Sequence, residues 1–363
     1  MKRFLMFLVI AIAVVSLGLT IYYFSTDNEV IYIKSSYLVV EKGDYIQAEG
    51  ENGLLEFKHR SEHTTLSYGL QQEDHEDETK NVLSYNEEGY YLAMNGGESK
   101  IVITTNNRNY SKLIIDVLVC DGSVDYPYMV RTEDDLRKVG VEDPNADDTL
   151  LASEYSYKLA NDIELTQPWN PIPSFKGMFD GNHFTISNME VTNSSSLTDA
   201  GFVSILESTG VIKNLFLTNI NINLDKNYIG AFAGTSYGLI QTSEADGVIV
   251  NTSSGKSSYV GGVAGRLIDS TAKIDRCGFA GTIKTTGTAV VAGGVAGSSN
   301  GAVVSETYFR GIVENGESIF GGIVGYNESK VNAPANIYDS YFYLTKEEAK
   351  TIKPWPYCPW ACT

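Results

Sequence analysis

A five-residue motif recurs at a nearly constant interval through the C-terminal half of the chain, and it constrains the fold more than any other feature. Its copies are Gly230-Ala-Phe-Ala-Gly234, Gly261-Gly-Val-Ala-Gly265, Gly293-Gly-Val-Ala-Gly297 and Gly321-Gly-Ile-Val-Gly325, preceded by a degenerate copy at Ala200-Gly-Phe-Val-Ser204. Their last positions, 204, 234, 265, 297 and 325, are 30, 31, 32 and 28 residues apart. This spacing indicates one structural unit repeated along the chain.

Further columns of similar residues follow the motif in every unit. An aliphatic column is followed three positions later by a mostly small one and five positions later by an apolar one. In order, these are Ile212, Ile240, Ile274, Val304 and Ile337; Leu215, Ser243, Cys277, Thr307 and Ser340; and Leu217, Ala245, Phe279, Phe309 and Phe342. Gly247, Gly281 and Gly311 close three of the units. Stacked parallel strands require such columns, because each strand fills the space directly above its neighbour.

The repeats predict an all-β stack with one turn of chain per repeat. A propeller blade needs about 40 residues and four strands, so a parallel β-helix of about five turns fits these shorter units better. We assign the motif glycines a structural role, since glycine permits sharp corners and close backbone approach. These positions are Gly230, Gly234, Gly261, Gly262, Gly265, Gly293, Gly294, Gly297, Gly321, Gly322 and Gly325. A short helix from Thr132 to Gly140, with a capping box at Asp135, is predicted to cover the first turn.

Residues 30–121 predict a separate β domain. Short alternating segments such as Lys100–Thr104 and Lys112–Val119 are separated by polar turn clusters, among them Glu41-Lys-Gly-Asp44. No helical period lies between them, so this stretch is predicted to be a small β-sandwich. Residues 126–345 form the predicted β-helix domain, and residues 346–363 follow no repeat column and are left unassigned.

The N-terminal residues 1–25 contain an uncharged run, Phe4–Phe24, that follows Lys2 and Arg3. At about 1.5 Å per residue the run matches a hydrocarbon core about 30 Å thick, which predicts a transmembrane helix acting as a signal anchor. The basic flank predicts a single-pass protein of the cell membrane whose body is extracytoplasmic. A cleaved signal peptide is the alternative, with Ser16-x-Gly18 as its best cleavage site and a secreted protein as its product.

Charge and cysteine usage exclude several classes of partner. The net charge of −18 argues against nucleic acid, because a phosphate backbone needs a cationic partner surface. Cys120, Cys277, Cys358 and Cys362 have no zinc-site spacing. Cys358 and Cys362 could form a disulfide in an oxidising compartment, and a frayed tail with free cysteines is the equal alternative. No cofactor motif is present either, because Gly-Gly-Val-Ala-Gly lacks the lysine of a phosphate-binding loop.

The candidate site residues favour structural roles over chemistry. Asp162, Glu164 and Asp180 are the best carboxylates for a polysaccharide-active enzyme, but Asn161-Asp162 and Asp180-Gly-Asn182 are also typical turn sequences. His183 beside them has no nucleophilic partner in the sequence. The acidic loop Glu142–Asp148 does not match a calcium-binding spacing, and the histidines near the first domain's polar middle, His59, His63 and His75, fit a solvated loop. We therefore predict no catalytic, metal or cofactor site.

Two sets of aromatic residues are expected to differ in exposure. Phe279, Phe309 and Phe342 are predicted to form an interior ladder. Five tyrosines lie nearer to the turns and are expected either at a binding surface or in ordinary edge packing: Tyr228, Tyr237, Tyr259, Tyr308 and Tyr326.

The start of the repeat domain resembles GLUG-repeat proteins. The resemblance is carried by Tyr157-Lys-Leu-Ala-Asn-Asp-Ile-Glu-Leu165, Trp169-Asn-Pro-Ile172, Phe175-Lys-Gly-Met-Phe-Asp-Gly-Asn182 and Ile186-Ser-Asn-Met189, in that order. It implies bacterial surface proteins with a right-handed parallel β-helix. Some regions of this type precede a metallopeptidase domain, whose His-Glu-x-x-His sequence is absent from this chain. The sequence Glu41-Lys-Gly-Asp44, with the later run Gly89–Thr105, is similar to bacterial immunoglobulin-like domains of group 2.

Together these features predict an all-β surface protein with an N-terminal transmembrane helix, an immunoglobulin-like β-sandwich and a right-handed β-helix of GLUG-type repeats. The predicted function is non-catalytic display for adhesion or for binding a surface glycan or protein ligand, with the membrane as a further partner. Two alternatives remain open, a polysaccharide-active β-helix enzyme and a purely structural envelope component.

Overall fold

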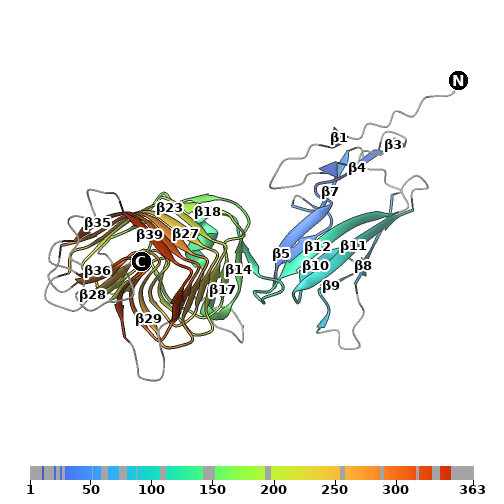
Figure 1. Cartoon of the computed structure of the whole chain (residues 1–363). Helices are drawn as coiled ribbons and strands as arrows, with labels where there is room; N and C mark the ends of the chain where they lie inside the picture. The colour runs from blue at the N-terminus through green and yellow to red at the C-terminus, as the bar shows by residue number, and fades with distance from the viewer. Residues whose placement is uncertain are drawn as a thin grey trace. The chain divides into compact units, whose positions relative to one another are not determined.

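The computed structural model places two compact units, residues Met1–Tyr128 and Met129–Thr363. It describes residues 10–11, 20–21, 25–26, 29–50, 52–58, 64–72, 80–86, 88–106, 112–141, 152–192, 198–253, 258–286, 290–315, 319–328 and 336–344. Figure 1 traces both units in one view.

The described N-terminal residues form strands. β1 (Ile10–Ala11) pairs antiparallel with β2 (Thr20–Ile21), so the chain reverses direction inside the apolar run. No helix in the described ranges is long and apolar enough to cross a membrane. The predicted transmembrane helix of residues 1–25 is therefore wrong, and the single-pass membrane placement that depended on it is wrong with it. Ile10 and Ile21 pair across this ladder, and branched side chains of this kind suit strands.

Besides the β1–β2 pair, the first unit contains three sheets that share one core. A four-stranded sheet runs in the order β5 (Tyr37–Glu41), β12 (Leu113–Cys120), β11 (Gly97–Thr105) and β8 (Leu66–Gln71). One three-stranded sheet runs in the order β6 (Tyr45–Gln47), β10 (Tyr90–Ala93) and β9 (Leu83–Tyr85). A second one runs in the order β3 (Ser25–Thr26), β4 (Glu29–Ile33) and β7 (Leu55–Lys58). Ile33, Tyr91 and Ile115, one from each sheet, belong to a single buried cluster. The immunoglobulin-like assignment of this unit stays a prediction.

The second unit is a parallel β-solenoid, which confirms the predicted all-β stack. We number its sheets in the order in which one turn of chain visits them. Sheet 1 contains β13 (Tyr128–Val130), β14 (Tyr157–Leu159), β17 (Met178–Asp180), β22 (Val211–Lys213), β26 (Leu239–Gln241), β30 (Lys273–Asp275), β34 (Val303–Ser305) and β38 (Asn336–Tyr338). Sheet 2 contains β15 (Ile163–Glu164), β18 (Thr185–Ser187), β19 (Glu190–Val191), β23 (Phe216–Leu224), β27 (Glu244–Asn251), β31 (Gly278–Thr285), β35 (Tyr308–Asn315) and β39 (Tyr341–Leu344).

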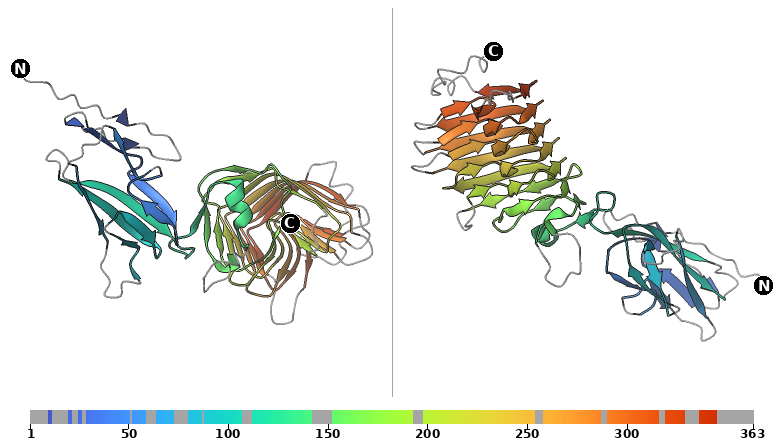
Figure 2. Two further views of the ribbon diagram at one scale, coloured as in Figure 1. Left: turned by 180° about the vertical axis from the view of Figure 1, so that it is seen from behind. Right: turned by 90° about the horizontal axis from the view of Figure 1, so that it is seen from below.

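Sheets 3 and 4 complete each turn. Sheet 3 contains β20 (Asp199–Ala200), β24 (Tyr228–Ile229), β28 (Ser258–Gly261), β32 (Val290–Gly293) and β36 (Ile319–Gly321). Sheet 4 contains β16 (Ile172–Phe175), β21 (Val203–Leu206), β25 (Ala233–Ser236), β29 (Ala264–Ile268), β33 (Ala296–Asn300) and β37 (Val324–Asn327). The right-hand view of Figure 2 looks across this stack of turns. Sheet 4 has six strands, one for each turn, so the solenoid makes about six turns where the repeat motif predicted five.

The repeat columns of the sequence lie in register through the stack. Phe179 pairs with Ile212, and the column continues through Ile240, Ile274 and Val304 to Ile337. In sheet 2 the column from Leu217 to Phe342 is likewise continuous. Phe279 and Phe309 are fully buried and stacked, with ring centroids 6.2 Å apart. Each turn therefore buries its apolar side chains against the same positions of the next turn.

A short helix packs on the first turn. α1 (Glu133–Lys138) begins after Thr132, whose hydroxyl accepts a hydrogen bond from the Asp135 amide, and the Asp135 carboxylate accepts from the Thr132 amide. Arg137 donates to the backbone carbonyls of Gln167 and Pro168, and the guanidinium lies 5.8 Å from the Trp169 ring centroid. A 3₁₀ turn, η2 (Ala152–Glu154), precedes β14. These contacts cover the N-terminal end of the stack.

The buried cysteine of the solenoid gives a first prediction. Cys277 is 1% exposed, and burial raises the pKa of its thiol to about 12. Because the thiolate is the reactive species, we expect iodoacetamide to label Cys277 at least ~100-fold more slowly in the native protein than in urea. Peptide mapping by mass spectrometry measures both rates. Equal rates in the two conditions would contradict the buried position.

Candidate functional site

A groove on the outer face of sheet 2 is the candidate functional site. Its volume is about 560 Å³, within the range of roughly 300–1,000 Å³ typical of small-molecule sites. It crosses strands β23, β27, β31 and β35 in four successive turns. The lining residues are Phe216, Leu217, Thr218, Glu244, Ala245, Asp246, Ala280, Gly281, Thr282, Tyr308, Arg310, Gly311 and Ile312.

Backbone forms part of the floor of the groove, because a glycine column leaves no side chains there. Gly247, Gly281 and Gly311 pair in register across β27, β31 and β35. A Cβ built on Gly281 would lie 2.0 Å from the Gly247 carbonyl oxygen, and one on Gly311 would lie 1.8 Å from the Gly281 carbonyl oxygen. These strands can approach in this way only without side chains. Beside this column, the pairing of β23 with β27 shifts register between Leu217 and Ile220.

One aromatic side chain spans three turns of the groove. Glu244, Gly278 and Tyr308 pair in register, and the Tyr308 ring occupies the space that a side chain at position 278 would need. The Tyr308 hydroxyl thereby lies near the Glu244 carboxylate. Burial, then the Glu244 charge and a hydrogen-bonding interaction with this carboxylate, raise the pKa of Tyr308 to about 12. Tyr308 is thus a fixed, neutral aromatic wall of the groove.

Charged groups of both signs flank the floor. Asp246, Ala280 and Arg310 occupy one outward column of β27, β31 and β35. One Asp246 oxygen accepts a hydrogen bond of 2.9 Å from the Asn219 amide. Arg310 is exposed, and its guanidinium makes no hydrogen bond or ion pair with any described residue. The Arg310 guanidinium, a hydrogen-bond donor, and the carboxylates of Glu244 and Asp246 therefore border the same surface, which is formed by backbone and apolar side chains.

Aromatic rings extend the groove at both ends. Tyr308 stacks on Tyr341 of β39 with ring centroids 5.9 Å apart. Phe216 lies at the other end, where the His183 ring is 6.4 Å from it. Tyr341 is 64% exposed, so its ring remains available to a ligand.

The carboxylates singled out from the sequence accept hydrogen bonds from backbone amides and from neighbouring side chains. Asp162 accepts from the Thr185 amide at 2.8 Å, and Glu164 accepts from the Asn188 side chain at 3.0 Å. Asp180 accepts from the Asn182 amide and from the Asn214 side chain, and Lys213 lies 3.5 Å away. None of the three lines the groove.

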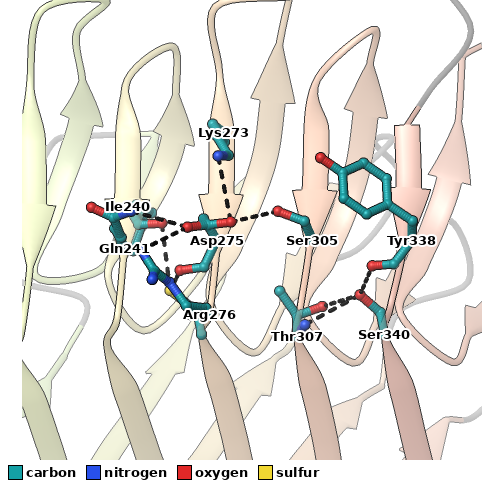
Figure 3. Close-up of polar contacts among 10 residues, drawn as sticks. Ile240, Gln241, Lys273, Asp275, Arg276, Ser305, Thr307, Tyr338 and Ser340 are labelled. Atoms are coloured by element: carbon teal, nitrogen blue, oxygen red, sulfur yellow. Dashed lines mark hydrogen bonds and ion pairs between the residues drawn. The ribbon is translucent and has the colours of Figure 1, made fainter.

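Asp275 is the centre of a polar ladder on the outer face of sheet 1, which the sequence did not single out. Ser305 and Gln241 donate hydrogen bonds to its two oxygens at 2.6 and 3.0 Å (Figure 3). Lys273 and Arg276 lie 3.4 and 3.1 Å from the same carboxylate. Burial opposes ionisation, but these hydrogen bonds and the Lys273 charge outweigh it and lower the pKa of Asp275 to about 2. Gln241, Asp275 and Ser305 belong to the paired strands β26, β30 and β34, so the ladder joins three turns.

Four of the five predicted tyrosines occupy two different places. Tyr308 lines the groove, whereas Tyr228, Tyr259 and Tyr326 stack beside one another at sheets 3 and 4, with centroid distances of 5.8 and 6.4 Å. The Arg266 guanidinium lies 3.8 Å from the Tyr228 ring centroid. This second set is half-buried apart from Tyr326 and packs along the corner of the solenoid.

His59, His63, His75 and the acidic loop 142–148 lie outside the described residues, as do Cys358 and Cys362. Within the described ranges, no group of three or more His, Cys, Asp or Glu side chains could hold a metal ion.

Comparisons with known proteins include one sequence similarity and one structural similarity described below. No family model matches the chain. A protein named Halomucin, from Haloquadratum walsbyi, is 33% identical over 126 residues, a match that covers 32% of this chain and 1% of Halomucin's length. A solved structure titled IgA1 Protease aligns with a TM-score of 0.39 and 17% identity, over 77% of this chain and 23% of that chain.

Proposed function

We propose that this protein is a non-catalytic surface protein that binds a carbohydrate chain in the groove of sheet 2. The observation that carries the proposal is the unpaired Arg310 guanidinium beside two carboxylates and the fixed Tyr308 ring. Aromatic faces pack against the C–H surfaces of sugars, and carboxylates accept hydrogen bonds from their hydroxyl groups. The similarity of a third of the chain to Halomucin is consistent with a surface protein.

The charge of the protein narrows the ligand. A net charge of −18 repels polyanions at long range, and the groove itself holds two acids against one arginine. A neutral or sparsely charged glycan therefore fits this surface better than a sulfated or polyuronic one. We also propose that the solenoid consists of GLUG-type repeats, that the protein acts in adhesion and that it binds a protein ligand. These three proposals favour a function outside the cell.

The test is a glycan array with the full chain, followed by calorimetric titration of any ligand found. We expect Tyr308→Ala and Arg310→Ala each to weaken binding at least ~10-fold, because each removes a contact worth about 1.4 kcal/mol or more. Lys284→Ala is the matched control, since Lys284 lies on the outer face of β31 outside the groove and pairs with Glu314. An array without ligands, or equal affinities for all variants, would overturn the proposal.

A glycan-cleaving enzyme is the second candidate, favoured by one observation. Glu244 and Asp246 project from the same face of β27 two residues apart, which places their Cβ atoms about 7 Å from one another. Two carboxyl groups on one face of a groove are the kind of pair that glycosidases use on either side of a scissile bond. New reducing ends released from a bound glycan by the wild type, but not by Glu244→Gln, would replace binding with hydrolysis as the function.

A further inference from the structure

The groove of sheet 2 extends along the axis of the solenoid. Its lining residues come from β23, β27, β31 and β35, which are neighbouring strands of four successive turns. Neighbouring strands lie about 4.8 Å apart, so the groove covers about 14 Å from the first of these strands to the fourth. In β23, β27 and β31 the lining spans only three residues, about 7 Å along the strand. The long direction of the groove therefore crosses the strands and follows the stack of turns seen in Figure 2.

Two columns of side chains border the groove along its length. On one side the Tyr308 ring extends across the neighbouring turn towards Glu244. On the other side Thr282 and Ile312 line the groove and pair in register with each other. Val248 continues this second column on β27, and Val248 and Ile312 are 39% and 38% exposed. A ligand that followed one strand would have to cross both columns, whereas a ligand that followed the axis would cross neither.

The spacing of the turns distinguishes between two kinds of extended chain. A sugar unit in an extended glycan is about as long as one strand spacing, so successive units meet successive turns at the same depth. An extended peptide rises about 3.3 Å per residue and repeats its side chains on one face about every 7 Å, so it does not stay in step with turns about 4.8 Å apart. The repeat of the solenoid therefore matches a glycan better than a peptide.

We propose that an extended, linear glycan lies along the solenoid axis in this groove, with one sugar unit on each turn. This inference rests on the proposed function and adds to it the conformation, direction and length of the ligand. Four units occupy the turns from β23 to β35. A fifth unit stacks on Tyr341, which pairs in register with Tyr308 on the next turn and is 64% exposed. A glycan whose linkages make it coil would leave the groove within a few turns.

Calorimetric titration of the full chain with neutral oligosaccharides of increasing length tests this inference. Cello-, manno- and chito-oligosaccharides are extended chains, and malto-oligosaccharides are coiled ones. For at least one extended series we expect the affinity to increase at least ~30-fold from the dimer to the pentamer, because each added unit gains a turn of the groove. The hexamer should bind no more than ~2-fold tighter than the pentamer, since its last unit extends beyond the groove. The malto-oligosaccharides should bind at least ~10-fold more weakly at equal length.

Two variants test the direction of the bound chain. Tyr341→Ala is expected to remove the gain from tetramer to pentamer, because it deletes the ring on which the fifth unit stacks. Lys284→Ala is the matched control. Lys284 lies on β31 beyond Thr282 and pairs with Glu314 at 2.8 Å, so a chain along the axis does not reach it, whereas a chain along the strand does. Its affinities should equal those of the wild type at every length.

The outcomes separate this inference from the proposed function. The axial arrangement would be overturned by full affinity for a dimer, by a preference for malto-oligosaccharides, by no binding of any extended series or by weaker binding to Lys284→Ala. In each of these cases a glycan array with bound ligands leaves glycan binding itself standing. An array without ligands would overturn the proposed function, and this inference with it.

Discussion

Replacing Gly311 with alanine is expected to destabilise the solenoid by at least about 3 kcal/mol. The new methyl group would lie 1.8 Å from the carbonyl oxygen of Gly281 and 2.8 Å from its carbonyl carbon. These are backbone atoms of the preceding turn, so no side-chain rotation can relieve the overlap. The strands must separate, and this would break pairing between β31 and β35, which share a register from Gly278–Tyr308 to Thr285–Asn315.

Denaturant unfolding followed by far-ultraviolet circular dichroism measures this loss. Gly69→Ala is the matched control, because a Cβ at that strand position meets only the Val102 carbonyl oxygen, at 3.9 Å. It should leave the free energy of unfolding unchanged or raise it slightly by restricting the unfolded chain. A change of less than about 0.5 kcal/mol for Gly311→Ala would mean that the turns are not stacked as closely as described.

The stack could be predicted from the sequence because its packing repeats. Ile240 contacts Ile212 and Ile274 at the same position of adjacent turns, so one apolar residue per turn is selected again and again. The repeat columns did not predict the first turn. It runs from β14 to β16 without the glycine motif and faces α1 on one side, so its residues meet a different neighbour.

The groove could not be predicted from columns in which similar residues repeat, because it is formed where a column contains residues of different size and charge. Glu244, Gly278 and Tyr308 share one column, and only the absence of a side chain at Gly278 lets Tyr308 reach Glu244. The sequence marked Tyr308 as one of five tyrosines near turns but gave no reason to separate it from Tyr228. The sequence did not show which tyrosine lies beside a glycine of the adjacent turn, where its ring has room to extend.

The N-terminal prediction was wrong for a related reason. Length and lack of charge were its only support, and neither property distinguishes an apolar helix from apolar strands. Ile10 and Ile21 lie in the same run and pair across an antiparallel ladder, a contact that depends on where the chain reverses. The run itself contains no proline or asparagine to mark that reversal.

Replacing Asp275 with alanine is expected to destabilise the solenoid by about 3 kcal/mol. The carboxylate is 7% exposed, and its loss leaves the Gln241 amide and the Ser305 hydroxyl without their acceptor. Unsatisfied donors of this kind cost about 1–3 kcal/mol each, and removing one partner of a buried ionic cluster costs about 3–5 kcal/mol. The Lys273 and Arg276 side chains are 40% and 51% exposed and regain water, which places the expected loss at the lower end of that range.

The same carboxylate predicts how stability depends on pH. The pKa of Asp275 is lowered from 3.8 to about 2 in the folded protein, so the unfolded state binds this proton more tightly. The resulting stabilisation, about 2 kcal/mol, is fully present above pH 4 and is lost as the pH falls through 2. Unfolding free energies of the wild type and Asp275→Asn, measured from pH 7 to pH 2, should therefore converge at the acid end.

Glu314→Gln supplies the control for that comparison. Glu314 pairs with Lys284 at 2.8 Å, but both side chains are about half exposed, so the pair contributes at most a few tenths of a kcal/mol. Its pH profile should run parallel to that of the wild type. If Asp275→Asn gives the same parallel profile, Asp275 is not held as an ion by Gln241 and Ser305, and the polar ladder does not join the turns of sheet 1.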